Sequence, residues 1–222
     1  MRKLVVGTFL TLDGVMQAPG GPEEDRSGGF GHGGWLVPWF DETMGQVMTD
    51  WIRGADGLVL GRKTYEIFAA HWPHVGDDDP IAAKLNAVRK HVASRTLRRL
   101  EWSNSAVIEG DVATAVRRLK EGPGGELQVH GSGALVQTLL EHGLVDELRL
   151  WIFPVLLGTG KRLFAEGTVA SRLELVETRT SSTGVILQVH RSAGRLDYGS
   201  FALEQPTPAE VERRRRAAEA GE

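Results

Sequence analysis

The apolar residues of this chain follow two different repeats. Residues 3–12 are a nearly continuous apolar run, which is typical of a strand buried on both faces of a sheet. Residues 41–52 instead carry apolar side chains every three to four positions, so they predict an amphipathic helix with Asp41 as its N-cap. Near the end of the chain, residues 173–180 and 185–191 alternate with a period of two, which predicts an antiparallel hairpin.

The segments between these regions alternate in the same way. Apolar runs and helical repeats follow one another from residue 57 to residue 155. Such alternation, ended by a hairpin, predicts an α/β fold with a mixed central sheet and helices on both of its faces. The expected strands are 57–60, 91–94, 106–108 and 147–155, and the expected helices are 64–70, 81–88, 112–120 and 134–141.

Two strand-to-helix turns stand out in this pattern. They are Gly61-Arg62-Lys63-Thr64 and Gly131-Ser132-Gly133-Ala134, and each follows an apolar run and opens a helix. The first turn of a helix has unpaired backbone N–H groups and the positive end of the helix dipole, so it favours a phosphate. Two such turns indicate a ligand with several phosphates.

One long segment, residues 17–38, is rich in glycine and proline and has no regular repeat. A loop of this length in a compact domain is either a functional lid or a disordered segment. Trp35 and Trp39, near its end, favour an ordered lid.

The last residues, 204–222, form a polar tail in which Thr207 and Pro208 predict the start of a helix. The basic run Arg213–Arg216 is more typical of a solvated terminal helix than of a nucleic-acid site, because no aromatic platform accompanies it. We therefore expect one domain over residues 1–203, followed by this tail.

Composition limits the partners of the protein. The chain has 222 residues, 41% of them hydrophobic, which is enough for one buried core. Its formal net charge of -3 argues against nucleic-acid or membrane partners. It has no cysteine, which excludes disulfides and cysteine-bound metals, and no apolar run of about 20 residues that could span a bilayer. We expect a cytoplasmic protein with a small anionic ligand and no metal.

Two common phosphate-binding motifs do not match this sequence. The segment 131–136 matches only the first two glycines of the dinucleotide-binding motif G-x-G-x-x-G. The segment Gly158-Thr159-Gly160-Lys161-Arg162 has the wrong spacing for a P-loop and lacks the Ser or Thr that would hold magnesium. A different nucleotide-binding arrangement is therefore required.

Five motifs in order resemble the dihydrofolate reductase-like superfamily. They are Thr11-Leu12-Asp13-Gly14-Val15-Met16, Gly61-Arg62-Lys63-Thr64-Tyr65-Glu66, Gly131-Ser132-Gly133, Gly143-Leu144-Val145-Asp146-Glu147-Leu148 and Pro154-Val155-Leu156-Leu157-Gly158-Thr159-Gly160. The chain most resembles the riboflavin-biosynthesis branch, namely the C-terminal reductase domain of the bifunctional deaminase-reductase, from about residue 2 to residue 201. The resemblance implies a dihydrofolate reductase-like three-layer α/β/α fold, NADPH as the cofactor and a homodimer.

The resemblance also implies where the cofactor binds. The turn from Gly61 and the end of the strand that follows it would hold the 2′-phosphate, the turn from Gly131 the pyrophosphate, and the segment from Gly14 the nicotinamide ring. A turn-forming or solvated role is the alternative for each group. In the family the second turn has two glycines joined by a cis peptide, and Ser132 departs from that pattern. The implied cofactor residues are Gly14, Val15, Met16, Gly61, Arg62, Lys63, Thr64, Ser94, Arg95, Gly131, Ser132, Gly133, Ala134 and Leu135.

Catalytic and substrate residues are less well defined by the resemblance. Asp13 and Asp41 are the candidate catalytic carboxylates, with a turn at Asp13 and a helix cap at Asp41 as the structural alternatives. The candidate substrate residues are Trp35, Trp151, Phe153 and Lys161, and the two residues from the later strand, Trp151 and Phe153, are equally compatible with the core.

The leading hypothesis is an NADPH-dependent reductase of a pyrimidine- or pterin-like small molecule, similar to 5-amino-6-(5-phosphoribosylamino)uracil reductase. The zinc deaminase half of the bifunctional enzyme is excluded because its signature needs cysteines. The alternatives are an NADPH-binding sensor or interaction protein without catalysis, and a nucleic-acid binder that uses the basic tail.

Overall fold

A single eight-stranded sheet forms the centre of the computed structural model, which describes residues 1–76 and 78–221. Its strands are β1 (Leu4–Thr11), β2 (Ala55–Gly61), β3 (Lys90–Ala93), β4 (Ser105–Val107), β5 (Glu126–His130), β6 (Glu147–Phe153), β7 (Leu173–Thr180) and β8 (Ile186–Ser192). The strand order is β4-β3-β2-β5-β1-β6-β8-β7. Neighbouring strands from β4 to β6 are parallel, whereas β8 is antiparallel to both β6 and β7.

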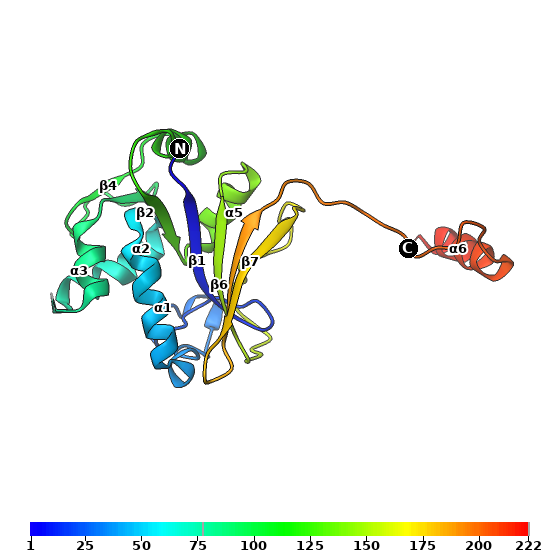
Figure 1. Cartoon of the computed structure of the whole chain (residues 1–222), viewed down its shortest axis with the longest axis horizontal. Helices are drawn as coiled ribbons and strands as arrows, with labels where there is room; N and C mark the ends of the chain where they lie inside the picture. Colours follow the sequence, from blue (N-terminus) through cyan, green and yellow to red (C-terminus); the bar gives the residue numbers. More distant parts are fainter. Residues whose placement is uncertain (77, 222) are drawn as a thin grey trace.

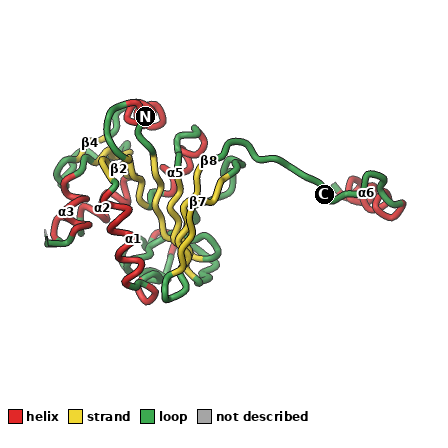
Figure 2. Tube along the Cα trace, viewed as in Figure 1, coloured by secondary structure: helices red, strands yellow, loops and turns green. Residues whose placement is uncertain are grey.

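Helices cover both faces of this sheet (Figures 1 and 2). They are α1 (Glu42–Arg53), α2 (Arg62–Ala69), α3 (Pro80–Ala87), α4 (Val112–Glu121), α5 (Gly133–Glu141) and, in the tail, α6 (Pro208–Ala220). Helices α1, α2 and α3 pack on one face, and α4 and α5 pack on the other. The predicted α/β fold, with a mixed sheet and a C-terminal antiparallel hairpin, is confirmed.

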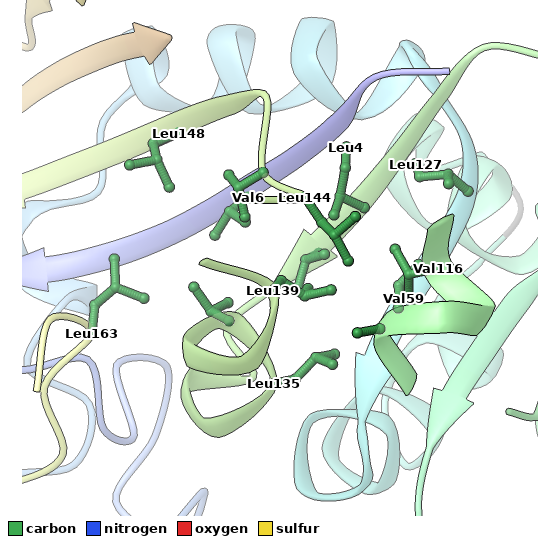
Figure 3. Packing of buried hydrophobic residues seen from close by; sticks show 14 of the residues in the cluster. Leu4, Val6, Val59, Val116, Leu127, Leu135, Leu139, Leu144, Leu148 and Leu163 are labelled. Carbon is green, nitrogen blue, oxygen red and sulfur yellow. The ribbon is translucent and has the colours of Figure 1, made fainter. Parts of the chain in front are cut away.

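The alternation of side chains along each strand produces the two layers of the core. On β1, the fully buried side chains of Leu4 and Val6 face α4 and α5, where Figure 3 shows them packed with Leu139 and Leu144. On the opposite face of the sheet, a second cluster joins α1 to β6 and β8, and a third joins α2 and α3 to β2 and β3.

Aspartate caps begin two of the helices, and the cap at Asp41 was predicted. Asp41 lies before α1, and its Oδ1 accepts a hydrogen bond from the Met44 N–H at 2.9 Å. Asp111 caps α4 by accepting from the Thr114 N–H at 2.8 Å. These caps fix where α1 and α4 begin, since they satisfy backbone donors that a helix leaves unpaired.

The tail differs from the rest of the chain. Helix α6 has no buried residue among those described, and Figure 1 shows it away from the sheet at the end of an extended segment. Its arginines pair with acidic side chains three or four residues away, for example Arg213 with Glu210 at 2.7 Å. The last residue of the predicted tail, 222, lies outside the described residues. None of the described helices combines the length and apolar character needed to cross a bilayer.

Candidate functional site

A cavity of about 1710 Å³ opens at the carboxyl ends of the parallel strands. The chain leaves β2 toward the β4 edge of the sheet, whereas it leaves β5 toward β6, so the strand order reverses between these neighbours. Ligand sites of open α/β sheets lie at such a reversal. Both predicted phosphate turns line the cavity, as do Ser94 and Arg95 after β3.

The two turns are joined by hydrogen bonds of one residue, Ser132. The Ser132 hydroxyl accepts from the Gly61 N–H at 3.0 Å and donates to the His130 carbonyl at 2.9 Å. The Ser132 N–H in turn donates to the Thr64 hydroxyl at 3.1 Å. Ser132 therefore holds the starts of α2 and α5 side by side at one cavity.

Backbone conformation explains the glycine in the second turn. Gly131 has a φ of +53°, and a Cβ at this position would lie 3.3 Å from the Thr64 hydroxyl oxygen. Only glycine fits this conformation and this close approach without strain. None of the described peptide bonds is cis, including the one before Ser132.

The loop 17–38 is ordered around one buried amide. The Gln17 side chain donates to the carbonyls of Asp25 and Ser27 at 3.0 and 2.9 Å, and it accepts from the Lys161 N–H at 3.0 Å. These bonds fold the first half of the loop against the segment after β6 and beside the cavity. These contacts fit an ordered loop, and its role as a lid stays a prediction.

Two lysines contact the tip of this loop. The Lys63 ammonium lies 3.3 Å from the Asp25 carboxylate and 3.1 Å from the Ser27 hydroxyl. The Lys161 ammonium contacts the same carboxylate, and it lies 2.6 Å from the same hydroxyl. Burial alone would raise the pKa of Asp25, but the hydrogen bonds from Lys161 and Ser27 outweigh it and lower the pKa below its usual range. The loop thus places an ionised carboxylate between two cations at the mouth of the cavity.

Both predicted catalytic carboxylates have structural contacts and lie outside the lining of the cavity. Asp13 accepts from the Thr11 hydroxyl at 2.5 Å and from the Gly158 N–H at 2.8 Å, and these bonds, the Thr11 bond first, lower its pKa to about 2. Besides capping α1, Asp41 accepts from the N–H and hydroxyl of Ser182 at 2.8 and 2.7 Å. The turn and cap alternatives fit these contacts, so the catalytic prediction has no geometric support at either residue.

Four other predicted residues also lie outside the cavity lining. Val15 is fully buried in the core, and Gly14 precedes it in the turn after β1, whereas Met16 lines the cavity. Trp35 packs edge-on against Phe153 at 5.2 Å in the cluster between α1 and the sheet. The apolar packing of these two rings removes them from the candidate substrate residues.

The remaining predicted residues do meet at the cavity. Arg62, at the start of α2, lies 3.2 Å from Glu66 on the same helix and stays half-exposed. Trp151 on β6 lines the inner part, where its ring meets Trp51 of α1 at 4.9 Å. The predicted site residues that line the cavity are Met16, Gly61, Arg62, Lys63, Thr64, Ser94, Arg95, Gly131, Ser132, Gly133, Ala134, Leu135, Trp151 and Lys161.

Sequence reasoning missed the polar floor of the cavity. Gln128, His130 and Arg149 line it from β5 and β6, on the face of the sheet toward α1. The signal was the alternation Glu126-Leu127-Gln128-Val129-His130, which places polar side chains on one face of a strand whose other face is apolar. Such polar residues on a largely covered face need partners, and those partners come from other strands.

Ion pairs fix most of this floor. The Arg149 guanidinium bonds both oxygens of Glu126, at 2.8 and 3.1 Å, and its Nε donates to Glu147 at 2.9 Å. The Gln128 amide donates to the Trp51 carbonyl at 2.7 Å and to Glu126 at 3.1 Å. Arg149 therefore pairs with the carboxylates of both Glu126 and Glu147, and neither of these carboxylates lines the cavity.

The fold and the cavity together define a doubly wound α/β protein whose ligand cleft opens at the carboxyl edge of its parallel strands. The chain belongs to the RibD C-terminal domain family, whose model matches residues 2–187. Among curated proteins, it is 31% identical over 199 residues to the uncharacterized protein YyaP of Bacillus subtilis, covering 87% of this chain and 96% of that protein. It is 26% identical over 192 residues to the uncharacterized protein YwjB of the same organism, covering 85% and 97%.

Solved structures share the fold at lower identity. A putative riboflavin biosynthesis protein from Shewanella sp. PV-4 is 20% identical, with a TM-score of 0.64, covering 86% of this chain and 98% of that one. A pyrimidine reductase-like protein from Corynebacterium diphtheriae is 15% identical, with a TM-score of 0.52, covering 86% and 92%. The deaminase/5-amino-6-(5-phosphoribosylamino)uracil reductase of Thermotoga maritima is 14% identical, with a TM-score of 0.58, and the match covers 86% of this chain and 57% of that longer one.

Proposed function

We propose that this protein is an NADPH-dependent reductase of a small pyrimidine- or pterin-like heterocycle. The observation that carries the proposal is the pair of helix starts joined through Ser132 at one end of the cavity, with flat aromatic side chains at the other. Membership of the RibD C-terminal domain family supports the same proposal. Two structural neighbours, which are described as a reductase and a reductase-like protein, support it as well.

The residues present fit a dinucleotide phosphate. The first N–H groups of α5 and the left-handed Gly131 suit the pyrophosphate, which the backbone must approach closely. Arg62 and Arg95, with the Ser94 hydroxyl, would engage the 2′-phosphate beside the start of α2. Bound there, NADPH supplies the hydride, and the protein supplies position and the exclusion of water.

The substrate would bind in the inner part of the cavity. Trp51, Phe68 and Trp151 give it flat apolar walls that suit a planar ring. Lys161, at the lid, is placed to meet a phosphate on a substrate's ribose arm, where it would replace the contact with Asp25. A ribosylamino-pyrimidine phosphate would satisfy both features.

The edge strand β7 supports a homodimer as part of this proposal. Every residue of β7 is exposed, including Leu175 and Val176. Long exposed edge strands are usually paired or covered. Sedimentation of the purified protein tests this point, since a monomer at micromolar concentration would contradict it.

Turnover is the direct test of the reductase. The purified protein is mixed with NADPH and a panel of amino-uracil, ribosylamino-pyrimidine and pterin compounds, and the decrease in NADPH absorbance is followed. At least one member of the panel should be reduced with saturation kinetics. Tight NADPH binding without turnover of any compound would instead favour the cofactor-binding sensor.

A further inference from the structure

His130 occupies the junction of the two ends of the cavity. It is the last residue of β5, directly before the Gly131 turn, and its side chain lines the cavity floor. Its ring lies 6.1 Å from the ring of Phe68 and next to Gly7 of β1, where a Cβ would stand 3.6 Å from Nδ1. A ligand that reached from the cofactor turns to the aromatic walls would pass this imidazole.

Hydrogen bonds fix the tautomer of His130. The Gln128 side-chain nitrogen donates to the Trp51 carbonyl and to the Glu126 carboxylate, so the Gln128 oxygen must face His130. That oxygen lies 3.2 Å from Nε2 of His130 and can only accept. The proton of the neutral imidazole is therefore on Nε2, and Nδ1 carries a lone pair.

The lone pair of Nδ1 is available to a ligand. No hydrogen bond from the described side chains reaches Nδ1, although every fully buried polar side-chain atom of the described residues has a partner. Because Nδ1 has no such partner, it is not fully buried. Burial first, and the nearby Arg149 guanidinium second, lower the pKa of His130 to about 4, so the ring is neutral near pH 7.

The other polar groups of the floor are already occupied. Arg149 is bonded to Glu126 and Glu147. The amide nitrogen of Gln128 donates to the Trp51 carbonyl, and its amide oxygen accepts from His130. The carboxylates among the described residues that line the cavity lie elsewhere, in the lid and at the start of α4; they are Glu23, Glu24, Asp25 and Asp111. The inner pocket therefore offers an acceptor without a negative charge.

From this arrangement we infer that His130 is a specificity-determining residue, whose Nδ1 accepts a hydrogen bond from a ring N–H of a neutral, planar, lactam-type heterocycle. The inference rests on the proposed function, since it names the substrate class of the same cavity. A protonated heterocycle is disfavoured, because the floor has no unpaired carboxylate for it and Arg149 lies close by. The side chains of α1 that line the cavity, Met48, Trp51 and Ile52, carry no acid that could pair with such a cation.

Two substitutions separate the roles of the two ring nitrogens. His130→Gln keeps a donor near the Nε2 position for the Gln128 oxygen but loses the Nδ1 acceptor. His130→Asn keeps an oxygen near the Nδ1 position but loses the bond to Gln128. The Ser132 hydroxyl bonds the backbone carbonyl of residue 130, so both variants keep the joined turns.

The test is calorimetric titration with lumazine, a planar pteridinedione with ring N–H groups, and with 1,3-dimethyllumazine, which has none. Wild type should bind lumazine about 10-fold more tightly than the dimethyl compound, as expected for one buried hydrogen bond. His130→Asn should keep this preference, and His130→Gln should reduce it to about 2-fold. A purely structural role for His130 predicts the reverse order, with His130→Asn the more damaging change.

Three results would overturn the inference: no binding of lumazine to wild type, no preference for it over the dimethyl compound, or full preference in His130→Gln. Should His130→Gln fail to fold, Gly7→Ala replaces it, since its methyl would lie in ordinary contact with Nδ1 and Cε1 and cover that edge of the ring. Gly7→Ala should lose the preference as well. Each titration is run with and without NADP⁺, so failure of cofactor binding is seen separately from failure at His130.

Discussion

The two ends of the cavity are built in different ways. At the proposed cofactor end, two short contiguous turns supply the site, and Ser132 joins them directly. At the floor, the polar groups come from different strands, and Gly7 of β1 lies between His130 of β5 and Arg149 of β6 in the sheet register. The first end depends on local backbone conformation, whereas the second depends on strand pairing. Substitutions should therefore damage the two ends by different physical routes.

The largest effect is expected at the floor. Arg149→Met would leave Glu126 and Glu147 without their main cation, and the Glu147 side chain is only 5% exposed. Breaking such a pair should lower the free energy of unfolding by about 3 kcal/mol, measured by urea denaturation. The matched control Arg53→Met removes an exposed pair with Asp50 and should cost less than about 0.5 kcal/mol. Equal losses of unfolding free energy in both variants would show that the ion pairs of the floor stabilise the protein no more than an exposed pair does.

A smaller effect on stability is expected at the cofactor end. Gly131→Ala would strain a left-handed residue and press a methyl against Thr64, at a cost of about 1–2 kcal/mol. Because the turn must shift, NADPH binding measured by fluorescence should weaken by about 10-fold. Gly184→Ala is the control, since Gly184 has a φ of +88° in open space at the hairpin, away from the cavity. Similar NADPH affinities in the two variants would mean that the Gly131 turn does not bind the phosphates.

The effect expected outside both ends, at Asp13, is confined to acidic pH. Its pKa is about 2 in the folded protein against an ordinary value of 3.8, so its contribution to stability is present above about pH 4 and is lost as the pH falls toward 2. Wild type should therefore lose about 1–2 kcal/mol more than Asp13→Asn between pH 5 and pH 2. Parallel pH profiles of the two proteins would show that the Thr11 and Gly158 contacts do not stabilise the ionised carboxylate.

The contrast between the two ends also explains what the sequence could predict. The strands, helices, caps and both turns are local patterns, and the structure contains them within a few residues of their expected limits. For Asp13 the sequence left a catalytic role and a turn open, because its contacts with the N–H groups of Leu157 and Gly158 are far away in the chain. Trp35 and Phe153 lie in the core, which the sequence could not separate from a cavity wall because an aromatic residue has the same sequence signature in both places.

His130 was missed for a related reason. A histidine at the end of a strand carries no local signal of function, and its tautomer is set by Gln128, whose own orientation depends on Trp51 of α1. Only the alternation of polar residues along β5 was visible in the sequence, and it indicated a polar face without naming its partners. Long-range pairing, not composition, builds the floor.

The central claim is that the joined turns hold NADPH, and the most direct measurement compares NADPH with NADH by calorimetric titration. Wild type should prefer NADPH, and the double variant Arg62→Ala, Arg95→Ala should lose about 10-fold or more of that preference while its affinity for NADH stays the same. Arg117→Ala, an exposed arginine on α4 away from the cavity, should behave as wild type. An unchanged preference in the double variant would contradict the account.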